Sequence, residues 1–342
     1  MPRRSALPGL LALLRNPRIY MALGFALGSL FIYLTVRGID WAQVREQLAS
    51  TSPVMLLAAL GLTLASAFIR AIRWRVLFVK ARISVLRLFP VEMAALGLNN
   101  ISPVRLLDEP AILTMLTLRD RMPAPTVIAT LLMSRVQDIA FSLCFIATSL
   151  ALEPAVAERA GAAAPVSLIL VGALLILLNL GRIARRVGPI GRIPGIFAYS
   201  AAVEEVTRNK RRLFATSSLT LYPLLLGPAA WALANGMGVE INLFQATIVA
   251  IAAVLFSTSI PGLPGSFGAF ELAVQEVLSL WGVPRELGFG FGFVLHLTFF
   301  IPPIVFAVLV LPREGIGIMQ NWRRLTDADA GSPRKVRNAK QG

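Results

Sequence analysis

The amino-acid sequence predicts an all-α, polytopic membrane protein, and three observations support this fold class. Hydrophobic residues occupy 56% of the 342 positions and charged residues only 15%, whereas soluble domains hold roughly 45–50% and about 25%. Six apolar stretches approach the ~20 residues that a helix needs to cross a bilayer. Two further apolar stretches are interrupted by polar, proline- and glycine-rich segments. We therefore expect about six full spans and two broken or re-entrant helical hairpins.

The uninterrupted stretches define one transmembrane domain over residues 19–311, with halves at about 19–150 and 166–311. Residues 1–18 form an N-terminal segment, and residues 312–342 form a basic tail that we expect to be disordered. The six expected spans are Ile19–Val36, Val54–Ile72, Val127–Leu150, Val166–Leu180, Leu213–Asn235 and Leu287–Leu311.

The basic residues between the spans predict the orientation of the chain, because Lys and Arg accumulate in cytoplasmic loops. The segment Arg70–Arg87 holds six basic residues and no acid, so it is expected inside. The linker 151–165 contains Glu153 and Glu158 against one Arg, so it is expected outside. The N-terminal segment and the tail are both basic. Both termini are therefore expected in the cytoplasm.

The two interrupted stretches must each cross the membrane an even number of times to satisfy this orientation. Leu88–Leu118 has limbs too short to span, so it is expected to be a hairpin that enters from inside. Leu243–Trp281 has longer limbs, so it is either a hairpin from outside or two full spans, which would bring the total to eight. Either way the second half is inverted relative to the first. Such inverted repeats carry substrate sites at their broken helices; the alternative is that both breaks are surface loops.

Composition also excludes several kinds of chemistry. One Cys and one His rule out an internal disulfide and any Cys- or His-cluster metal site. We expect no metal, no cofactor and no catalytic soluble domain. The formal net charge is +15. We expect the basic residues to orient the chain in the membrane and to contact anionic headgroups. The sequence has no basic stripe interleaved with aromatic residues, so nucleic acid is not an expected partner.

Polar residues are unusually dense in the first break. Asn99, Asn100, Arg105 and Glu109 lie between two apolar limbs, together with Asp108. Arg105 is suited to grip a phosphate, and Glu109 to balance its charge. The alternative is an ion pair that only closes the hairpin.

The second break is rich in glycine. It contains Pro261, and its candidate site residues continue through Gly262, Gly265, Ser266 and Gly268. Exposed amides in such a break can accept a phosphate oxygen at a helix N-terminus; the alternative is a hinge. Glu271, one turn beyond, is a candidate to balance the empty site or to carry a coupling proton.

Two further places hold ionisable groups at membrane depth. Arg135 and Asp138, at i and i+3 in one span, are expected to pair on one helix face. They either support the broken helices or contact the substrate directly. His296 in the last span is either a proton relay or an interhelical hydrogen-bonding residue.

The order of these elements resembles the lysylphosphatidylglycerol synthase transmembrane region family, which are flippase-like membrane proteins of bacteria and archaea. The segment Ile69–Leu77, with Arg73 and Trp74, is similar to the family's arginine-rich RW segment. Asn99 and Asn100 precede a proline-centred break, Arg135 and Asp138 match an R-x-x-D span, and the segment from Ile260 to Glu271 is similar to a Pro-Gly-Gly-x-Gly-x-x-Glu element. The resemblance covers roughly Ile19 to Leu311.

Three departures accompany the resemblance. The first break has Ser-Pro-Val-Arg-Leu-Leu-Asp-Glu where the family has Pro-Gly-Arg-x-Gly-Glu. Ser134 stands where an acid often precedes the arginine, and the glycine element is slightly longer.

The resemblance implies a protein that binds and translocates an anionic or polyprenyl-linked lipid across the cytoplasmic membrane. Only about 30 residues follow Leu311, so we expect no aminoacyl-transferase domain on this chain. Two alternatives remain open: a membrane transferase that acts on a lipid-linked donor, and a noncatalytic partner of a separate lipid synthase. A homo-oligomer is also compatible with the sequence.

Overall fold

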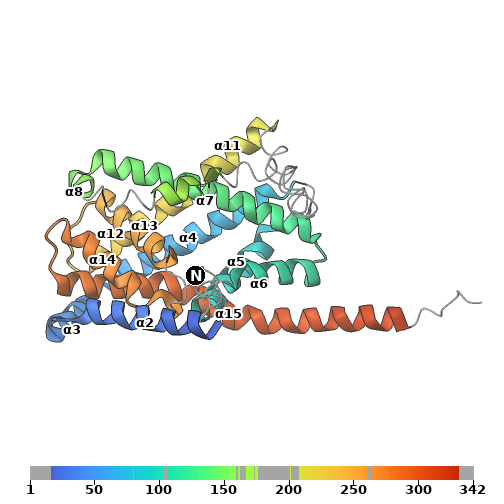
Figure 1. The fold of residues 1–342 in the computed structure, drawn as a ribbon, viewed down its shortest axis with the longest axis horizontal. Coiled ribbons are helices and arrows are strands. Elements are labelled where there is room, and N and C mark those ends of the chain that lie inside the picture. Colours follow the sequence, from blue (N-terminus) through green and yellow to red (C-terminus); the bar gives the residue numbers. More distant parts are fainter. Residues whose placement is uncertain are drawn as a thin grey trace, which may run out of the picture.

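The computed structural model describes residues 17–79, 81–102, 107–158, 161, 167–172, 174–175, 201, 208–259 and 264–330. Within these residues every regular element is a helix, as the sequence predicts. The longer helices run roughly parallel along the long axis of the molecule (Figure 1). They are α2 (Pro17–Val36), α3 (Trp41–Ser50), α4 (Pro53–Leu77), α5 (Val85–Ile101), α6 (Asp108–Thr114), η1 (Met115–Arg119), α7 (Ala124–Leu152), α8 (Pro154–Ala157), α11 (Lys210–Leu219), η3 (Tyr222–Leu225), α12 (Leu226–Gly236), α13 (Leu243–Ser259), η4 (Pro264–Ser266), α14 (Ala269–Ser279) and α15 (Arg285–Ala330).

Four stretches of the described residues are long and apolar enough to cross a membrane: Pro53–Leu77, Ala124–Leu152, Lys210–Gly236 and Arg285–Gly315. Helix α2 covers the expected first span with 20 residues, about 30 Å of helix. The expected span Leu213–Asn235 is not one regular helix, because Pro223 lacks an amide hydrogen and a short 3-10 turn, η3, joins α11 to α12. Of the expected span Val166–Leu180, the structure describes residues 167–172 and 174–175, and these positions are helical.

The first interrupted stretch is a helical hairpin. Ser84 caps the start of α5 by accepting a hydrogen bond from the Arg87 amide (3.1 Å), and α5 ends at Ile101, shortly before Pro103. The return limb is α6 continued by the π-helical η1, together 12 residues or about 18 Å at helical rise, and α5 and α6 pack together. This limb is too short to span a bilayer.

The second interrupted stretch is also a hairpin. Helix α13 has 17 residues and α14 has 11, so α14 reaches only about 16 Å. The two helices pack against each other. The alternative of two full spans is therefore not what the structure shows.

The tips of the two hairpins meet inside the molecule. A Cβ added to Gly265 would lie 3.6 Å from the backbone oxygen of Asn100, and α5 contacts η4. In Figure 1 the α5–α6 hairpin and the α13–α14 hairpin occupy opposite ends of the bundle. The two breaks, far apart in sequence, thus share one place in the fold.

Each hairpin has its own apolar core. Buried residues of α12, α13, α14 and α15 form one cluster, in which alanines let the helices approach closely. A second cluster joins the end of α4 to α5, α6, η1 and α7 around the buried Trp74. Helix α15 packs on both hairpins. Its closest approach is at Gly97 of α5, where an added Cβ would lie 2.0 Å from the Pro303 carbonyl oxygen.

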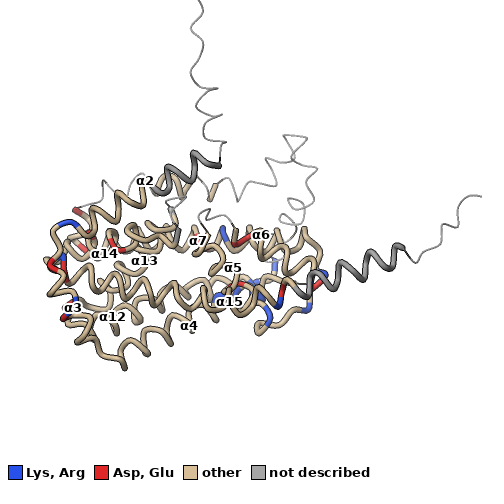
Figure 2. Tube along the Cα trace, turned by 90° about the horizontal axis from the view of Figure 1, so that it is seen from below, with Lys and Arg blue, Asp and Glu red and all other residues tan. Residues whose placement is uncertain are grey.

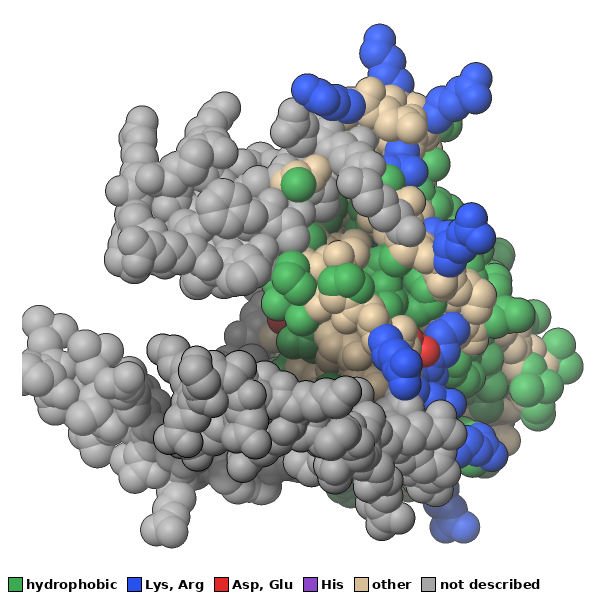
Figure 3. All heavy atoms as spheres, turned by 90° about the vertical axis from the view of Figure 1, so that its right-hand side faces the viewer, with side chains coloured by type: hydrophobic (Ala, Val, Ile, Leu, Met, Phe, Trp, Pro, Cys, Tyr) green, Lys and Arg blue, Asp and Glu red, His purple; other side chains and the backbone are tan. Residues whose placement is uncertain are grey.

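The two ends of the bundle differ in charge. Figure 2 marks Lys and Arg positions along the chain trace near α6 and α15, and Figure 3 shows Lys and Arg side chains on the face at that end of the bundle. Basic residues of that end are Arg75, Arg82, Arg87, Arg119, Arg121, Arg208, Lys210, Arg211, Arg212 and Arg313. The opposite end, with α3, α8 and α14, carries Asp40, Glu46, Glu153, Glu158, Glu240, Glu276 and Glu286 against Arg37, Arg45 and Arg285. The two ends of the bundle therefore carry different net charges.

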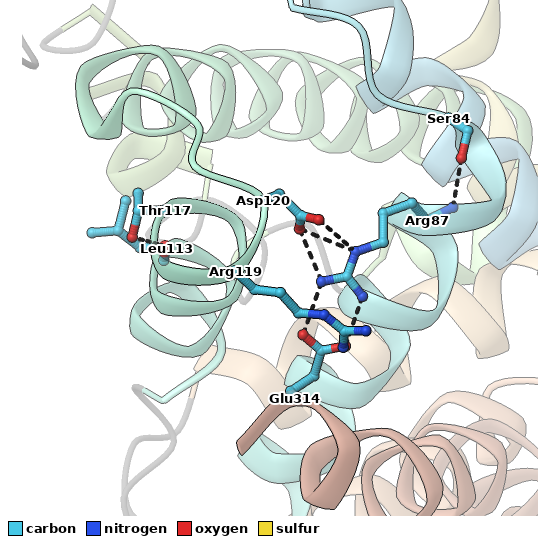
Figure 4. Close-up of polar contacts among 7 residues, drawn as sticks. All are labelled: Ser84, Arg87, Leu113, Thr117, Arg119, Asp120 and Glu314. Carbon is cyan, nitrogen blue, oxygen red and sulfur yellow. Dashed lines mark hydrogen bonds and ion pairs between the residues drawn. The ribbon is translucent and has the colours of Figure 1, made fainter. Parts of the chain in front are cut away.

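A charged network ties three elements together at the basic end (Figure 4). Glu314 of α15, only 4% exposed, accepts hydrogen bonds from Arg87 of α5 (2.6 and 2.8 Å) and from Arg119 of η1. Arg87 also donates to Asp120 (2.9 to 3.1 Å). The network fixes the base of the first hairpin to the last span.

Candidate functional site

A cavity of about 560 Å³ lies between the first hairpin, α4, α7, the η3–α12 turn, the end of α13 and the middle of α15. Its walls combine apolar residues, such as Leu96, Phe141 and Phe299, with a dense group of charged side chains. The charged residues that line it are Arg70, Arg73, Glu92, Asp108, Glu109, Arg135 and Asp138. Groups of this kind at membrane depth are costly, and they face protein or a wet cavity.

Helix α4 supplies two of the three guanidinium groups. Residues 63, 66, 67, 70, 73 and 74 line the cavity and recur at helical spacing, so they occupy one face of α4. Arg73, 1% exposed, donates from Nη1 to Oδ1 of Asp138 at 2.6 Å, and its guanidinium stacks 5.1 Å from the centre of the Tyr222 ring. Arg70 lies 2.8 Å from Glu92 as an ion pair.

Arg135 completes the arginine group from α7. Its Nε donates to Glu109 at 2.9 Å and its Nη2 to Asp108 at 3.4 Å. Both Arg135 and Glu109 keep about half of their side-chain surface accessible (51% and 48%). These groups line the cavity, so this pair is open to a ligand there.

The expected pairing of Arg135 with Asp138 is wrong. Helical spacing at i and i+3 permits such a pair, but each side chain finds a partner on another element. Asp138 turns to Arg73 of α4, and the hydroxyl of Tyr222 lies 3.5 Å from it. Arg135 turns to the two acids that begin α6. Interhelical partners therefore replace the local one.

The first break contributes its two asparagines to the cavity. Asn99 and Asn100 line it, and Asn99 Oδ1 also accepts a hydrogen bond from the Leu107 amide (3.2 Å), which closes the break. The expected phosphate ligand Arg105 lies outside the described residues. Glu109, expected to balance Arg105, accepts a hydrogen bond from Arg135.

Several buried acceptors in the cavity wall have no hydrogen-bond partner among the residues that the structure describes. Oε2 of Glu92, Oδ1 of Asn100 and the hydroxyl of Ser134 are buried in this state. Buried polar atoms are nearly always satisfied, so these atoms mark positions where a ligand or water would donate. The cavity thus offers both guanidinium donors and free acceptors.

Of the described residues of the second break, Pro264 to Gly268, none lines the cavity. Ser257 and Thr258, at the end of α13, are the residues next to this break that line the cavity. Gly265 and Gly268 adopt positive φ angles of 60° and 84°, which glycine accepts without strain. Ser266 is buried and donates to the Ser257 carbonyl (3.2 Å). Pro261 and Gly262 lie outside the described residues.

Glu271 is 3% exposed, and its Oε2 accepts a hydrogen bond from the Gly268 amide (2.8 Å). That amide is therefore already occupied and is not free for a phosphate. Oε1 of the same carboxyl contacts Nδ1 of the fully buried His296 at 2.6 Å. His296 does hydrogen-bond between helices, one of its two expected roles.

Sequence reasoning missed Arg70, Glu92 and Tyr222 as cavity residues. Arg70 is used in the sequence analysis only as a basic residue that predicts the orientation of the chain. Its spacing of three residues from Arg73 also indicates that both lie on one helix face. Glu92 is a single acid in an apolar limb, itself a signal of a buried partner. Tyr222 carries no comparable signal. Trp74, an expected supporting residue, lines the cavity and donates from Nε1 to Thr130 (3.1 Å).

Among the residues that the structure describes, no group of three or more His, Cys, Asp or Glu side chains is arranged to hold a metal ion. The family model of the lysylphosphatidylglycerol synthase TM region matches residues 21–307. No curated protein matches the chain.

Proposed function

Since the chain belongs to the lysylphosphatidylglycerol synthase TM region family, we propose that it binds the headgroup of an anionic or polyprenyl-linked lipid in the charged cavity and carries it across the cytoplasmic membrane. The observation that carries this proposal is the cavity itself: three guanidinium groups at membrane depth, next to both hairpin breaks. Helical proteins rarely keep such groups in a membrane without a functional use.

The size and lining of the cavity fit a headgroup. A volume of about 560 Å³ lies within the range of small-molecule pockets, ~300–1,000 Å³. Arginine binds phosphate through paired N–H groups, while the apolar walls suit the glycerol or prenyl portion. The acyl or prenyl chains then remain in the bilayer.

Arg135 is the residue best placed to exchange partners. Its present acceptors, Glu109 and Asp108, are themselves partly accessible, so a phosphate can replace them at modest cost. The acids keep the guanidinium neutralised while the site is empty. Arg73 is instead fully buried against Asp138, which suits it to shape the cavity.

Two features support transport rather than binding alone. The hairpins lie at opposite ends of the bundle and their tips meet, as expected for an inverted repeat that opens alternately to the two sides. On this proposal the basic end of the bundle faces the cytoplasm, as do both termini. Breaking and re-forming the contacts between the two hairpin tips would then expose the cavity to one side of the membrane at a time.

Leaflet exchange of labelled lipid in vesicles that contain the purified protein tests the proposal. Phosphatidylglycerol and a polyprenyl phosphate are the probes, and diacylglycerol, which lacks a phosphate, is the negative probe. Arg135→Gln should slow exchange several-fold and Arg135→Lys should restore part of it, because a point charge replaces a two-pronged donor. Arg313→Gln, an exposed arginine outside the cavity, is the matched control.

Equal exchange by Arg135→Gln and the parent would remove the cavity from the transport path. If no probe moves but the lipid is chemically altered in the presence of a lipid-linked donor, the transferase alternative replaces transport. If neither happens, and a lipid synthase copurifies, the noncatalytic partner role is favoured.

A further inference from the structure

A buried pair of side chains lies next to the second break, and its hydrogen bonds can be counted. The two nitrogens of the His296 ring face two different acceptors: Nδ1 lies 2.6 Å from Oε1 of Glu271, and Nε2 lies 2.8 Å from the backbone oxygen of Gly265. A neutral imidazole has only one N–H. Two contacts therefore need either a second N–H on the ring or a hydrogen on the Glu271 carboxyl.

The contact with Gly265 determines which ring nitrogen carries a hydrogen. A carbonyl oxygen only accepts, so Nε2 must carry a hydrogen. Nδ1 then meets Glu271 in one of two forms: an imidazolium beside a carboxylate, or a neutral imidazole that accepts from a protonated carboxyl. Both forms hold one proton more than a neutral histidine with a carboxylate. The observed contacts thus require a bound proton.

The surroundings of the pair are aromatic and apolar. Phe267, Phe270 and Phe300 pack around the ring, with centroids 4.1 to 4.8 Å away. With the proton the pair is neutral overall, whereas without it a net negative charge stays buried among these rings, which is costly.

Other charged groups lie on the helices around the pair. They include Glu276 on α14, Arg285 and Glu286 at the start of α15, Glu92 on α5 and Arg37 after α2. Glu92 pairs with Arg70, and Arg285 donates to the Leu34 carbonyl. In the part of the chain that the structure describes, none of them forms a hydrogen bond or ion pair with Glu271 or His296.

We propose that Glu271 and His296 form a proton-binding site that controls the conformation of the second break. When the proton leaves for the aqueous phase, a neutral His296 that still donates to the Glu271 carboxylate presents a bare Nε2 to the Gly265 oxygen. Two lone pairs then face each other, so the Gly265 contact breaks. Gly265 lies at the tip that meets Asn100 of the first hairpin, so the proton state reaches the place where both hairpins touch.

The same site supplies a coupling ion for transport. That role rests on the proposed function, whereas the proton site does not. Broken helices in secondary transporters commonly hold the coupling ion, and here Phe300 both lines the charged cavity and packs against His296. Protonation would hold the second break closed, and its loss would release it.

Opening of the tip can be measured by thiol labelling without any lipid assay. Ser266 is fully buried, so Ser266→Cys in a Cys144→Ser chain reports opening. Its labelling rate is divided by that of Glu240→Cys, an exposed position, because thiol reactivity itself rises with pH. The ratio should rise several-fold as the pH is raised from about 6 to about 9.

Glu271→Gln is the decisive variant. The amide oxygen can still accept from the Gly268 amide, its NH₂ can donate to Nδ1, and Nε2–H can still donate to Gly265. Every contact is kept with no extra proton, so the labelling ratio should become independent of pH and stay low. Glu276→Gln, an exposed acid on the same helix, should behave like the parent.

The single histidine gives a second readout on the parent chain. In protein purified with a tag that lacks histidine, ¹⁵N-imidazole signals can come only from His296. They should change with the same midpoint as the labelling ratio. A flat ratio in the parent, or a pH dependence that survives Glu271→Gln, overturns the proposal. If no lipid moves but the ratio depends on pH and on Glu271, the proton site stands and the proposed function fails.

Discussion

Removal of the Asp138 carboxylate would leave the Arg73 guanidinium charged and buried. Arg73 is 1% exposed, and its contacts are Asp138 at 2.6 Å and the ring of Tyr222. Breaking such a pair by the loss of one partner costs about 3–5 kcal/mol. Since ~1 kcal/mol shifts the thermal midpoint by about 2–4 °C in chains of moderate size, Asp138→Ala should lower the midpoint by roughly 10 °C.

A half-exposed ion pair provides the comparison for this loss of stability. Arg135 and Glu109 are about half accessible, so Arg135→Ala should cost at most about 1 kcal/mol and shift the midpoint by only a few degrees. The assay is size-exclusion chromatography of the detergent-solubilised protein after heating, which measures the fraction that stays monodisperse.

Two double variants identify the true partner of Asp138. Arg73→Met with Asp138→Leu removes both charges and should recover most of the lost stability. Arg135→Ala with Asp138→Ala should be as unstable as the sum of its single changes, since their side chains share no direct bond. Recovery in the second double variant and not in the first would refute the pairing and the cavity geometry built on it.

Three further predictions concern other parts of the fold. Gly97→Ala should destabilise the protein by about 1–3 kcal/mol or more, because its Cβ would lie 2.0 Å from a backbone oxygen of α15; Gly61→Ala, with nothing within 4 Å, should be neutral in the same thermal assay. Glu314→Gln should cost about 3 kcal/mol, because two guanidinium groups lose their shared carboxylate, and added salt should not restore the lost midpoint. In a cysteine-free chain, an impermeant thiol reagent should label Glu240→Cys in intact cells and Arg82→Cys only after lysis; the reverse pattern would invert the orientation.

The positions of the two hairpins could be predicted from the sequence because their signals are local. Asn, Pro and Gly interrupt apolar runs there, and membrane length rules out a full span for a short limb. The length of α14 was harder to predict. Apolar residues continue through Trp281, so composition alone left two full spans open, and the helix end at Ser279 decided the question.

The partners of the charged residues could not be predicted from local spacing. Arg73 and Asp138 are 65 residues apart, and Glu271 and His296 are 25 apart. In a membrane, every ionisable side chain must find a partner, but the partner is chosen by how helices pack. Spacing along one helix suggested Arg135 with Asp138, and packing gave each residue a different neighbour.

The contacts of α15 make the length of this helix as important as its composition. His296, Pro303 and Glu314 meet the second break, the first hairpin and the basic network in turn. They are spaced by seven and eleven residues, about two and three helical turns, so they lie on one face. The exposed residues Ile301, Val305 and Val308 lie toward the opposite face.

These three contacts therefore fix the register of α15. One residue inserted between Pro303 and Glu314 would turn Glu314 by about 100° and move it about 1.5 Å along the axis relative to His296. The carboxylate would leave both guanidinium groups while every side chain in the helix stayed chemically the same. Apolar substitutions on the outer face should accumulate freely in this helix, whereas single insertions and deletions should not.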